Sequence, residues 1–519
     1  MGNKIGLRIK VFFFTMNRFK APIASIIVLL LTITAVSLLV GLPYAAADED
    51  TLFLDLAQDS QASEIVPRED GVTRAKWVEI NWNALENPQT REIKVNLFDG
   101  ETKTAVHDRT DPSTSAGGYV WVGHIEGDPY SSITLSIVGD VLVGSISPRG
   151  IEQYTIRYQD GRQVLQEIDA GSRIEMEGPD VIPAPAVSVQ SDNEATYCED
   201  GSRIDLLVAY SASARVQEGG TAAIEALINK RVADMNTANI NSGLSFNFRL
   251  VHVMETSYEE TGDVLVDLQR LRLGYLDDVD QAREKYLADM VSLIIGQATV
   301  NESCGVAYLM QGLSTAYAST AINVTALDYL GSPTCSEFTM GHEFGHNMGN
   351  QHDRENANNN GIYPYAYGYQ SPNHTFRTIM AYQCSGTSCP RINYWSNPDV
   401  IFLGEPTGID HDKDPSNSAD NARSMAQTAY YVANFRENCD RPATSTHTPT
   451  PTHTATPTHT ATPTHTATPT QQPSASPGIT VTVTTATSTP VTSTPGATHV
   501  PSTPSPELTY YIAIPVILN

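Results

Sequence analysis

Residues 334–353, TCSEFTMGHEFGHNMGNQHD, constrain this chain more than any other segment. His342 and His346 are four residues apart, so on a helix their imidazoles lie on one face and reach the same ion. Glu343 points about 100° away from His342, beside the ion, where its carboxylate can polarise a bound water. His352 then supplies a third ligand. Three neutral nitrogens plus water describe an open catalytic zinc site rather than a closed structural one.

The neighbouring residues predict how this segment folds. Thr334 and Glu337 form a capping box that predicts the start of a helix. Gly349 lets the chain turn after the helix, so that His352 returns to the ion. Three apolar side chains lie on the face opposite the histidines and are expected to pack in the core: Met340, Phe344 and Met348. The alternative, a buried helix with incidental histidines, fits poorly with a glycine and a third histidine at fixed offsets.

This spacing resembles the long zinc signature of the metzincin metallopeptidases. The resemblance implies a Met-turn, which we place at Met380 in the segment FRTIMAY; its thioether would form a hydrophobic floor beneath the zinc ligands. Tyr382 stands where astacin- and serralysin-like members have a tyrosine that stabilises the oxyanion. The alternative for Tyr382 is an ordinary core aromatic. Asp353, after the third histidine, is instead similar to the reprolysin-like members.

The segments CGVAYL, HEFGHNMGNQHD, FRTIMAY and PRINYWSNPDV most closely resemble the bacterial peptidyl-Asp metalloendopeptidases, over about residues 205–436. Members of that family cleave on the amino side of Asp, which implies a cation in the substrate pocket. Arg377 and Arg391 are the candidates, because a guanidinium pairs bidentately with a carboxylate. Ordinary salt bridges are the alternative for both arginines.

The resemblance also gives a role to the predicted strand at residues 305–309. In metzincins the equivalent strand is an antiparallel edge that pairs with the extended substrate. Gly305, Val306 and Ala307 are therefore candidate substrate-binding residues. A plain edge strand without this role is the alternative.

Strands and helices alternate from residue 198, which predicts an α/β catalytic domain (198–440) with a mixed, mostly parallel sheet around the active-site helix. Residues 48–197 have no cysteine and show period-two patterning, which predicts a β-rich domain and linker. This segment resembles the pro-domains of reprolysin-type metzincins, so we expect a zymogen. Because it has no thiol to bind zinc, inhibition must be steric or use another ligand. A carbohydrate- or surface-binding module is the alternative.

Residues 1–47 have basic residues, an apolar run and an Ala-x-Ala site, which predict a cleaved signal peptide; an uncleaved anchor is the alternative. Residues 441–506 are rich in Thr, Pro and Ser and predict a disordered stalk, followed by an apolar tag at 507–519. We therefore expect a secreted protein, with attachment to the cell surface or envelope through the stalk. The formal charge of −26 in 519 residues excludes nucleic acid as a partner. We expect a monomer.

Six cysteines allow 15 disulfide connectivities. The pairing with the shortest reach joins Cys304 to Cys335, Cys384 to Cys389 and Cys198 to Cys439. Cys198 as a thiolate ligand of the zinc is the alternative. The acidic run that begins at Asp410, DHDKDP, suggests a Ca²⁺ site only weakly, since no glutamate follows at the required distance; a solvated acidic loop fits better.

These features together predict an exported zinc metalloendopeptidase that acts on proteins or peptides. Glu343 would be the general base and then the proton donor to the leaving amine. A surface adhesion protein that keeps the zinc fold without turnover is one alternative, although Glu343 and all three histidines are intact. A zinc amidase acting on cell-wall peptides is the other.

Overall fold

The computed structural model describes residues 51–54, 71–169, 180–185, 198–300, 302–331 and 335–436. All of them fall within one compact unit. The predicted signal segment 1–47, the stalk 441–506, the tag 507–519 and Cys439 lie outside the described residues. Among the described helices, none is long and apolar enough to span a membrane.

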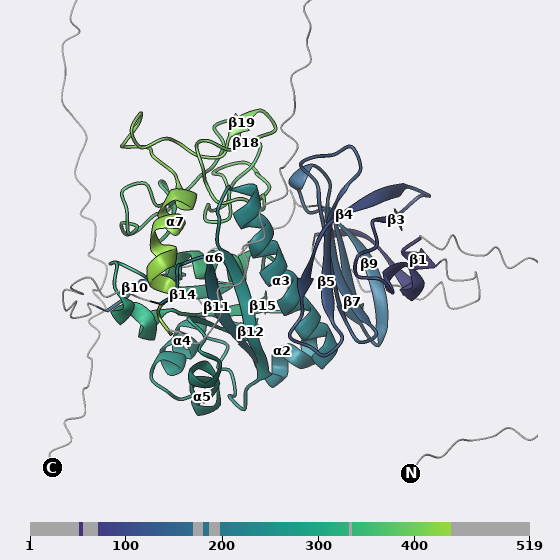
Figure 1. Cartoon of the computed structure of the whole chain (residues 1–519), viewed down its shortest axis with the longest axis horizontal. Coiled ribbons are helices and arrows are strands. Elements are labelled where there is room, and N and C mark those ends of the chain that lie inside the picture. The colour runs from purple at the N-terminus through teal and green to yellow at the C-terminus, as the bar shows by residue number, and fades with distance from the viewer. Residues whose placement is uncertain are drawn as a thin grey trace, which may run out of the picture. The chain divides into compact units, whose positions relative to one another are not determined.

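The N-terminal part of the chain forms a nine-stranded antiparallel sheet, purple to blue in Figure 1. Its strand order is β1-β2-β9-β8-β7-β6-β5-β4-β3. The Leu52 N–H donates to the Lys94 carbonyl of β3 at 2.8 Å, so the two edges of the sheet meet around one apolar core. The strands are β1 (Phe53–Leu54), β2 (Val72–Ile80), β3 (Glu92–Asn96), β4 (Thr102–Pro112), β5 (Tyr119–Ile125), β6 (Ser132–Val138), β7 (Val141–Ser147), β8 (Tyr154–Gln159) and β9 (Arg162–Ile168), with short 3₁₀ helices at Trp82–Leu85 and Pro148–Gly150.

The second sheet has six strands in the order β10-β14-β15-β13-β11-β12. Strands β12, β11, β13 and β15 run parallel, and β14 runs antiparallel to β15. The strands are β10 (Val181–Pro183), β11 (Arg203–Tyr210), β12 (Asn247–Glu255), β13 (Met290–Ala298), β14 (Gly305–Leu309) and β15 (Ile322–Tyr329). Strand β13 lies inside the sheet, which explains its continuous apolar sequence. Strand β14 would be an edge, but β10 covers it.

Helices connect and cover these strands. They are α2 (Ala212–Gln217), α3 (Thr221–Asn241), α4 (Val264–Arg272), α5 (Asp277–Tyr286), α6 (Thr339–Asn347) and α7 (Asn421–Val432), with a 3₁₀ helix at Thr315–Thr320. Helix α6 packs on β14 and β15. The short strand pairs β16 (Gln351–Asp353) with β17 (Tyr367–Gly368), and β18 (Ile401–Phe402) with β19 (Glu405–Pro406), order the loops that follow.

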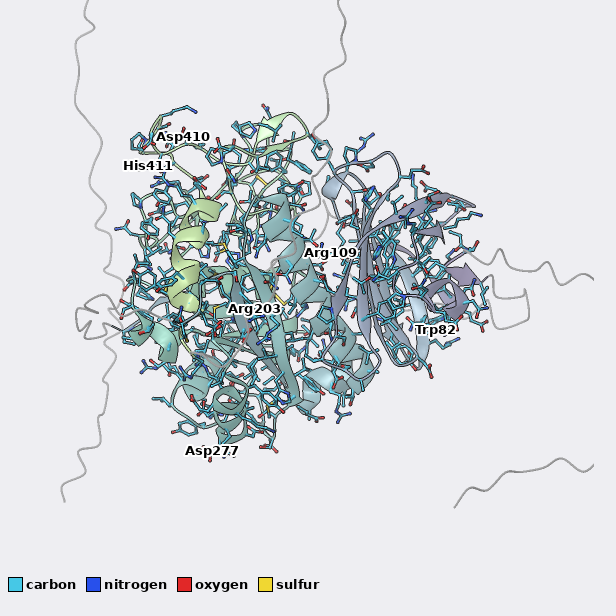
Figure 2. The ribbon with its side chains drawn as sticks, in the orientation of Figure 1. Trp82, Arg109, Arg203, Asp277, Asp410 and His411 are labelled. Atoms are coloured by element: carbon cyan, nitrogen blue, oxygen red, sulfur yellow. A yellow bond between two sulfur atoms is a disulfide. The ribbon has the colours of Figure 1, made fainter. Side chains whose placement is uncertain are left out.

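Helix α3 lies between the two sheets and is buried on both sides (Figure 1). Apolar residues of β6 and β7 join its core, and Arg109 of β4 donates to the Ala233 carbonyl at 2.9 Å and to Thr237 at 2.8 Å (Figure 2). Because α3 is covered on two sides, its charged residues Lys230 and Asp234 are almost fully buried. Their side chains pair with each other at 2.9 Å. The nine-stranded sheet is therefore anchored to the α/β part through this helix.

Helix α6 begins later than the predicted capping box requires. Its first residue is Thr339, and no side chain caps it. Thr334 lies outside the described residues, and Glu337 lies before the helix, so the capping-box interpretation was wrong. Glu337 is instead buried and pairs with Arg157 of β8. The sequence near the helix could not predict this, because the partner comes from the other sheet.

Candidate active site

Helix α6 places three of the predicted site residues on adjoining faces. His342, Glu343 and His346 are at most 4% exposed. Their helix is fixed from the opposite side by Met340, Phe344 and Met348, which are fully buried, as predicted. The chain then turns at Gly349 (φ +86°). A side chain there would also collide with Ile362, so the position requires glycine both for its conformation and for its space.

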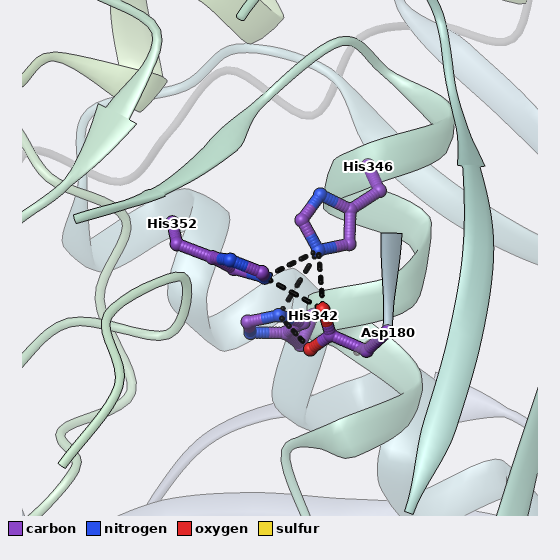
Figure 3. A group of neighbouring side chains, drawn as sticks. All are labelled: Asp180, His342, His346 and His352. Atoms are coloured by element: carbon purple, nitrogen blue, oxygen red, sulfur yellow. Dashed lines mark hydrogen bonds and ion pairs between the residues drawn. The ribbon is translucent and has the colours of Figure 1, made fainter. Parts of the chain in front are cut away.

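His352, on β16, returns to the two helical histidines (Figure 3). Its Nε2 lies 3.0 Å from Nε2 of His346, which lies 3.1 Å from Nε2 of His342. Nδ1 of His342 donates to the Ile379 carbonyl at 2.9 Å, and Nδ1 of His346 to the Asn350 carbonyl at 2.8 Å. These bonds leave the Nε2 lone pairs of both rings directed at one point.

The residues present fit a zinc ion. Tetrahedral zinc with Zn–N of about 2.1 Å separates its nitrogen ligands by about 3.4 Å, close to the observed spacing. Burial lowers the pKa of His342 and His346, in His346 reinforced by the charges of the neighbouring rings, so both are neutral ligands. Three lone pairs facing each other in a buried space repel unless a cation lies between them.

A fourth ligand atom at this point comes from Asp180, which no sequence pattern singled out. Its carboxylate lies 2.9 Å from Nε2 of His352, 3.2 Å from Nε2 of His342 and 4.0 Å from Nε2 of His346 (Figure 3). All four side chains are buried, and their ligand atoms lie within 4.8 Å of one another. Asp180 immediately precedes β10, far from the histidines along the chain. It is a single acidic residue in a proline-rich stretch, so only the tertiary structure reveals it.

Glu343 lies against the first residue of β14. A side chain at Gly305 would come within 2.9 Å of two carbons of Glu343 and closer still to one carboxylate oxygen. The glycine therefore makes room for the carboxylate. Burial raises the pKa of Glu343 well above its usual value; the charge of Asp180 raises it further and that of Arg391 opposes the rise. A carboxyl group with a raised pKa beside a metal site is suited to accept and return a proton.

The loop with Met380 lies directly beneath the histidines. Met380 is fully buried, and a side chain at Gly345 of α6 would collide with its sulfur. The preceding residue, Ile379, accepts the hydrogen bond from His342. The loop therefore supports the ligands both by packing and by orienting one imidazole.

Tyr382 is half-buried and lines the same cavity. Its ring lies 4.2 Å from that of His352, measured between centroids. Its backbone N–H donates to Asp353 at 3.0 Å, so the residue after the third histidine holds the tyrosine segment in place. Tyr382 is therefore at the cavity wall rather than in the core.

The two predicted arginines have different surroundings. Arg391 lines the cavity with Glu343 and Tyr382. Arg377 is 1% exposed, and its guanidinium donates to the carbonyls of Ala381 at 2.7 Å and Cys389 at 3.2 Å. Arg377 thus orders the loop after Met380, while Arg391 faces the site.

The remaining predicted residues are distributed as follows. Gly305, Val306 and Ala307 pair with β15 on one side, and Ala307 pairs with β10 on the other. Disulfides join Cys304 to Cys335 and Cys384 to Cys389. The predicted partner of Cys198, Cys439, lies outside the described residues. Asp410 forms an ion pair with Lys413 at 3.0 Å in a peripheral loop (Figure 2). Among the described residues, the one cluster of metal-ligand side chains is that of Asp180 and the histidines.

The chain is similar to several known proteins. The sequence model Reprolysin_5, of metallo-peptidase family M12, matches residues 200–396. A peptidyl-Asp metalloendopeptidase of Xanthomonas campestris pv. campestris is 30% identical over 383 residues, which cover 70% of this chain and 86% of that protein. One of Stenotrophomonas maltophilia (strain K279a) is 32% identical over 340 residues, covering 63% and 74%. Metalloproteinase-II of Bacteroides fragilis has a solved structure that aligns with a TM-score of 0.34 at 13% identity, over 65% of this chain and 90% of that one.

A helix with two buried histidines and a glutamate, joined by a third histidine in a group that can hold a metal ion, lies within a region that matches family M12; together these features define a metallopeptidase. The chain belongs to the family of the peptidyl-Asp metalloendopeptidases. The predicted function is confirmed: it is a zinc-dependent metalloendopeptidase that acts on protein or peptide substrates.

Proposed function

We propose that His342, His346 and His352 hold the catalytic zinc and that Glu343 is the general base. The convergence of the three Nε2 atoms beside a buried carboxylate carries this assignment. Zinc, when bound, supplies a Lewis acid that makes water acidic near neutral pH and polarises a carbonyl. The histidines bind the metal in this proposal and do no acid–base work; burial lowers the pKa of His342 and His346, which favours their neutral form.

Glu343 moves the proton in this proposal. Its carboxylate takes a proton from the attacking water and returns it to the leaving amine. Gly305 and the start of β14 hold the carboxylate on the cavity side of α6, so it needs no rearrangement between the two transfers. Tyr382, at the cavity wall beside His352, donates a hydrogen bond to the developing oxyanion. Gly305, Val306 and Ala307 bind the substrate backbone once the outer edge of β14 is accessible.

We propose further that the enzyme cuts on the amino side of Asp, with Arg391 as the residue that recognises the aspartate. The relatives are named for this residue, and Arg391 is the arginine that lines the cavity next to Glu343. A buried guanidinium pairs with a carboxylate more strongly than with a neutral amide. Arg377 is not part of this pocket in the proposal, because it is 1% exposed and does not line the cavity.

The domain organisation remains part of the proposal. We assign 48–197 to an inhibitory pro-domain with its linker and 198–440 to the peptidase domain. In this scheme the chain is exported after loss of 1–47, acts as a monomer, and uses 441–519 for attachment to the cell surface. The two disulfides are consistent with export, because such bonds persist in oxidising compartments.

The test is mass-spectrometric mapping of cuts in a denatured protein mixture. The zinc-loaded chain, before and after limited proteolysis, is compared with Glu343→Ala. Cuts before Asp that disappear in the variant support the proposal. Release of peptidoglycan fragments without cuts in proteins would favour the amidase alternative. A zinc-loaded wild type that cuts neither substrate would favour the adhesion alternative.

The pocket has a separate test. Two peptides that differ only in Asp or Asn after the scissile bond are compared with wild type and Arg391→Gln. We expect kcat/KM for the Asp peptide to fall about 10- to 100-fold in the variant, as for loss of a charged hydrogen bond, with little change for the Asn peptide. An equal fall for both peptides would refute the role of Arg391 in recognition.

A further inference from the structure

Asp180 occupies the position at which a fourth zinc ligand would bind. Its side chain is 9% exposed, and its two oxygens face the three Nε2 atoms of the histidines (Figure 3). The group has the composition of a closed tetrahedral site, three nitrogens and one carboxylate oxygen, whereas a catalytic site keeps one position for water. The carboxylate thus fills the position that the reaction requires to be open.

The residues after Asp180 cover the edge of β14 at which an extended substrate would bind. Strand β10 pairs with β14 in parallel: Val181 is opposite Ala307 and Pro183 is opposite Leu309. The Ala184 N–H donates to the Leu309 carbonyl at 3.1 Å. This edge of β14 is the one that an extended substrate would use. One continuous segment, residues 180–184, therefore covers both the metal position and the outer edge of β14.

We propose that Asp180 is a zinc ligand supplied by the chain's own N-terminal region and that, together with β10, it holds the peptidase inactive. This inference rests on the proposed zinc ligands. It answers how a region without a thiol inhibits the site: a carboxylate replaces the water, and a strand replaces the substrate.

The segment is bound as an inhibitor and not as a substrate. The backbone carbonyl of Asp180 accepts a hydrogen bond from the Ala307 N–H at 2.8 Å, so it is engaged with β14. The group that faces the histidines is the side-chain carboxylate. The peptide carbonyl of Asp180 is thus directed to β14 and not to the metal position, where the side-chain carboxylate lies instead.

The nine-stranded sheet keeps Asp180 near the site. Arg157 of β8 bonds to Glu337, just before α6, and to Glu218 at 3.3 Å. Arg109 bonds to α3. A ligand tethered in this way acts at a high effective concentration, so a single carboxylate competes with free peptides.

The experiment measures whether the metal is accessible in the full chain. Glu343→Gln is used as background to prevent self-cleavage, and each protein is loaded with zinc and its zinc content measured. Binding of a peptide hydroxamate, which must coordinate the metal, is followed by calorimetry. Asp180→Asn is the test variant, because it keeps the size and removes the charge. Asp140→Ala, an exposed aspartate in the turn between β6 and β7, is the matched control.

We expect Asp180→Asn to bind the hydroxamate at least about tenfold more tightly than the background, because the tethered competitor is weakened. The control should not change. In cobalt-substituted protein, Asp180→Asn should also alter the visible absorption bands, since a ligand is exchanged.

The possible outcomes distinguish the inhibitory role of Asp180 from the proposed zinc site. Stoichiometric zinc with equal hydroxamate affinity in both proteins would overturn the role of Asp180 and leave the proposed function intact. Absence of zinc from every variant, with His346→Ala no different from the background, would overturn the proposed ligands and with them this inference.

Discussion

Gly305→Ala tests whether the first residue of β14 positions the catalytic carboxylate. The added methyl would lie within 2.9 Å of two carbons of Glu343 and closer to one of its oxygens. Non-bonded carbons pack at about 3.5 Å or more, so the carboxylate must move by roughly 1 Å. Strand β14 cannot yield easily, because Gly305, Val306 and Ala307 pair with β15.

A displacement of about 1 Å in a catalytic group costs roughly 100-fold in rate, which is about 2.7 kcal/mol of transition-state stabilisation. We therefore expect kcat of the processed enzyme to fall about 100-fold, while zinc content stays at one ion per chain because the histidines are untouched. Initial rates on a fluorogenic peptide and metal analysis measure both quantities.

Gly312→Ala is the matched control. It lies just beyond the same strand, and the atoms nearest to its added methyl would be those of the Tyr317 side chain, at 3.2 Å and beyond. Its kcat should stay near that of wild type. If Gly305→Ala kept full kcat, the close approach of Glu343 to β14 would be irrelevant to catalysis. Loss of zinc from the variant would instead show that the change damages the metal site.

Three further predictions concern buried charged residues and the packing beneath the histidines. Lys230→Met leaves the buried carboxylates of Asp234 and Glu337 without this cation and should lower the free energy of unfolding by about 3–5 kcal/mol in urea titrations; Lys413→Met, at an exposed ion pair, should not change it, and equal effects would contradict the role of burial. Gly345→Ala pushes a methyl against the Met380 sulfur and, at 3.3 Å, against Trp395, so zinc affinity in a chelator competition should fall at least about tenfold; unchanged affinity would refute the supporting role of the loop. Burial raises the pKa of Asp289 well above normal, so the folded state binds its proton more tightly, and this contribution to stability is present below pH of about 3.9 and is lost as pH rises through the folded pKa. Relative to wild type, Asp289→Asn should therefore become more stable between pH 4.5 and 7.5; a difference independent of pH would show that the carboxyl titrates normally.

Several elements of the fold were predictable because their signals are local. The strand predicted at residues 305–309 is β14, with the same bounds, and strands and helices alternate from residue 198 as predicted. The three histidines and Glu343 were found because helical spacing places them on adjoining faces, and glycine after the helix allows the return of His352. The family and its chemistry followed from the same stretch.

Tertiary structure changed the interpretation where partners come from distant segments. Glu337 looked like a capping residue, but it pairs with Arg157 across the two sheets. Helix α3 is buried by the six-stranded sheet on one side and by the nine-stranded sheet on the other. Local periodicity contains no information about a second layer that packs from outside.

The sequence by itself identified the family and predicted the metal ligands and the base, because these depend on residues within a few helical turns of one another. Only the tertiary structure decided which arginine faces the cavity, why Gly305 must be a glycine, and that Asp180 lies beside the three histidines. Each of these depends on a distance between segments that are far apart in the chain. Such distances are set by how sheets and helices pack, and a one-dimensional pattern does not encode them.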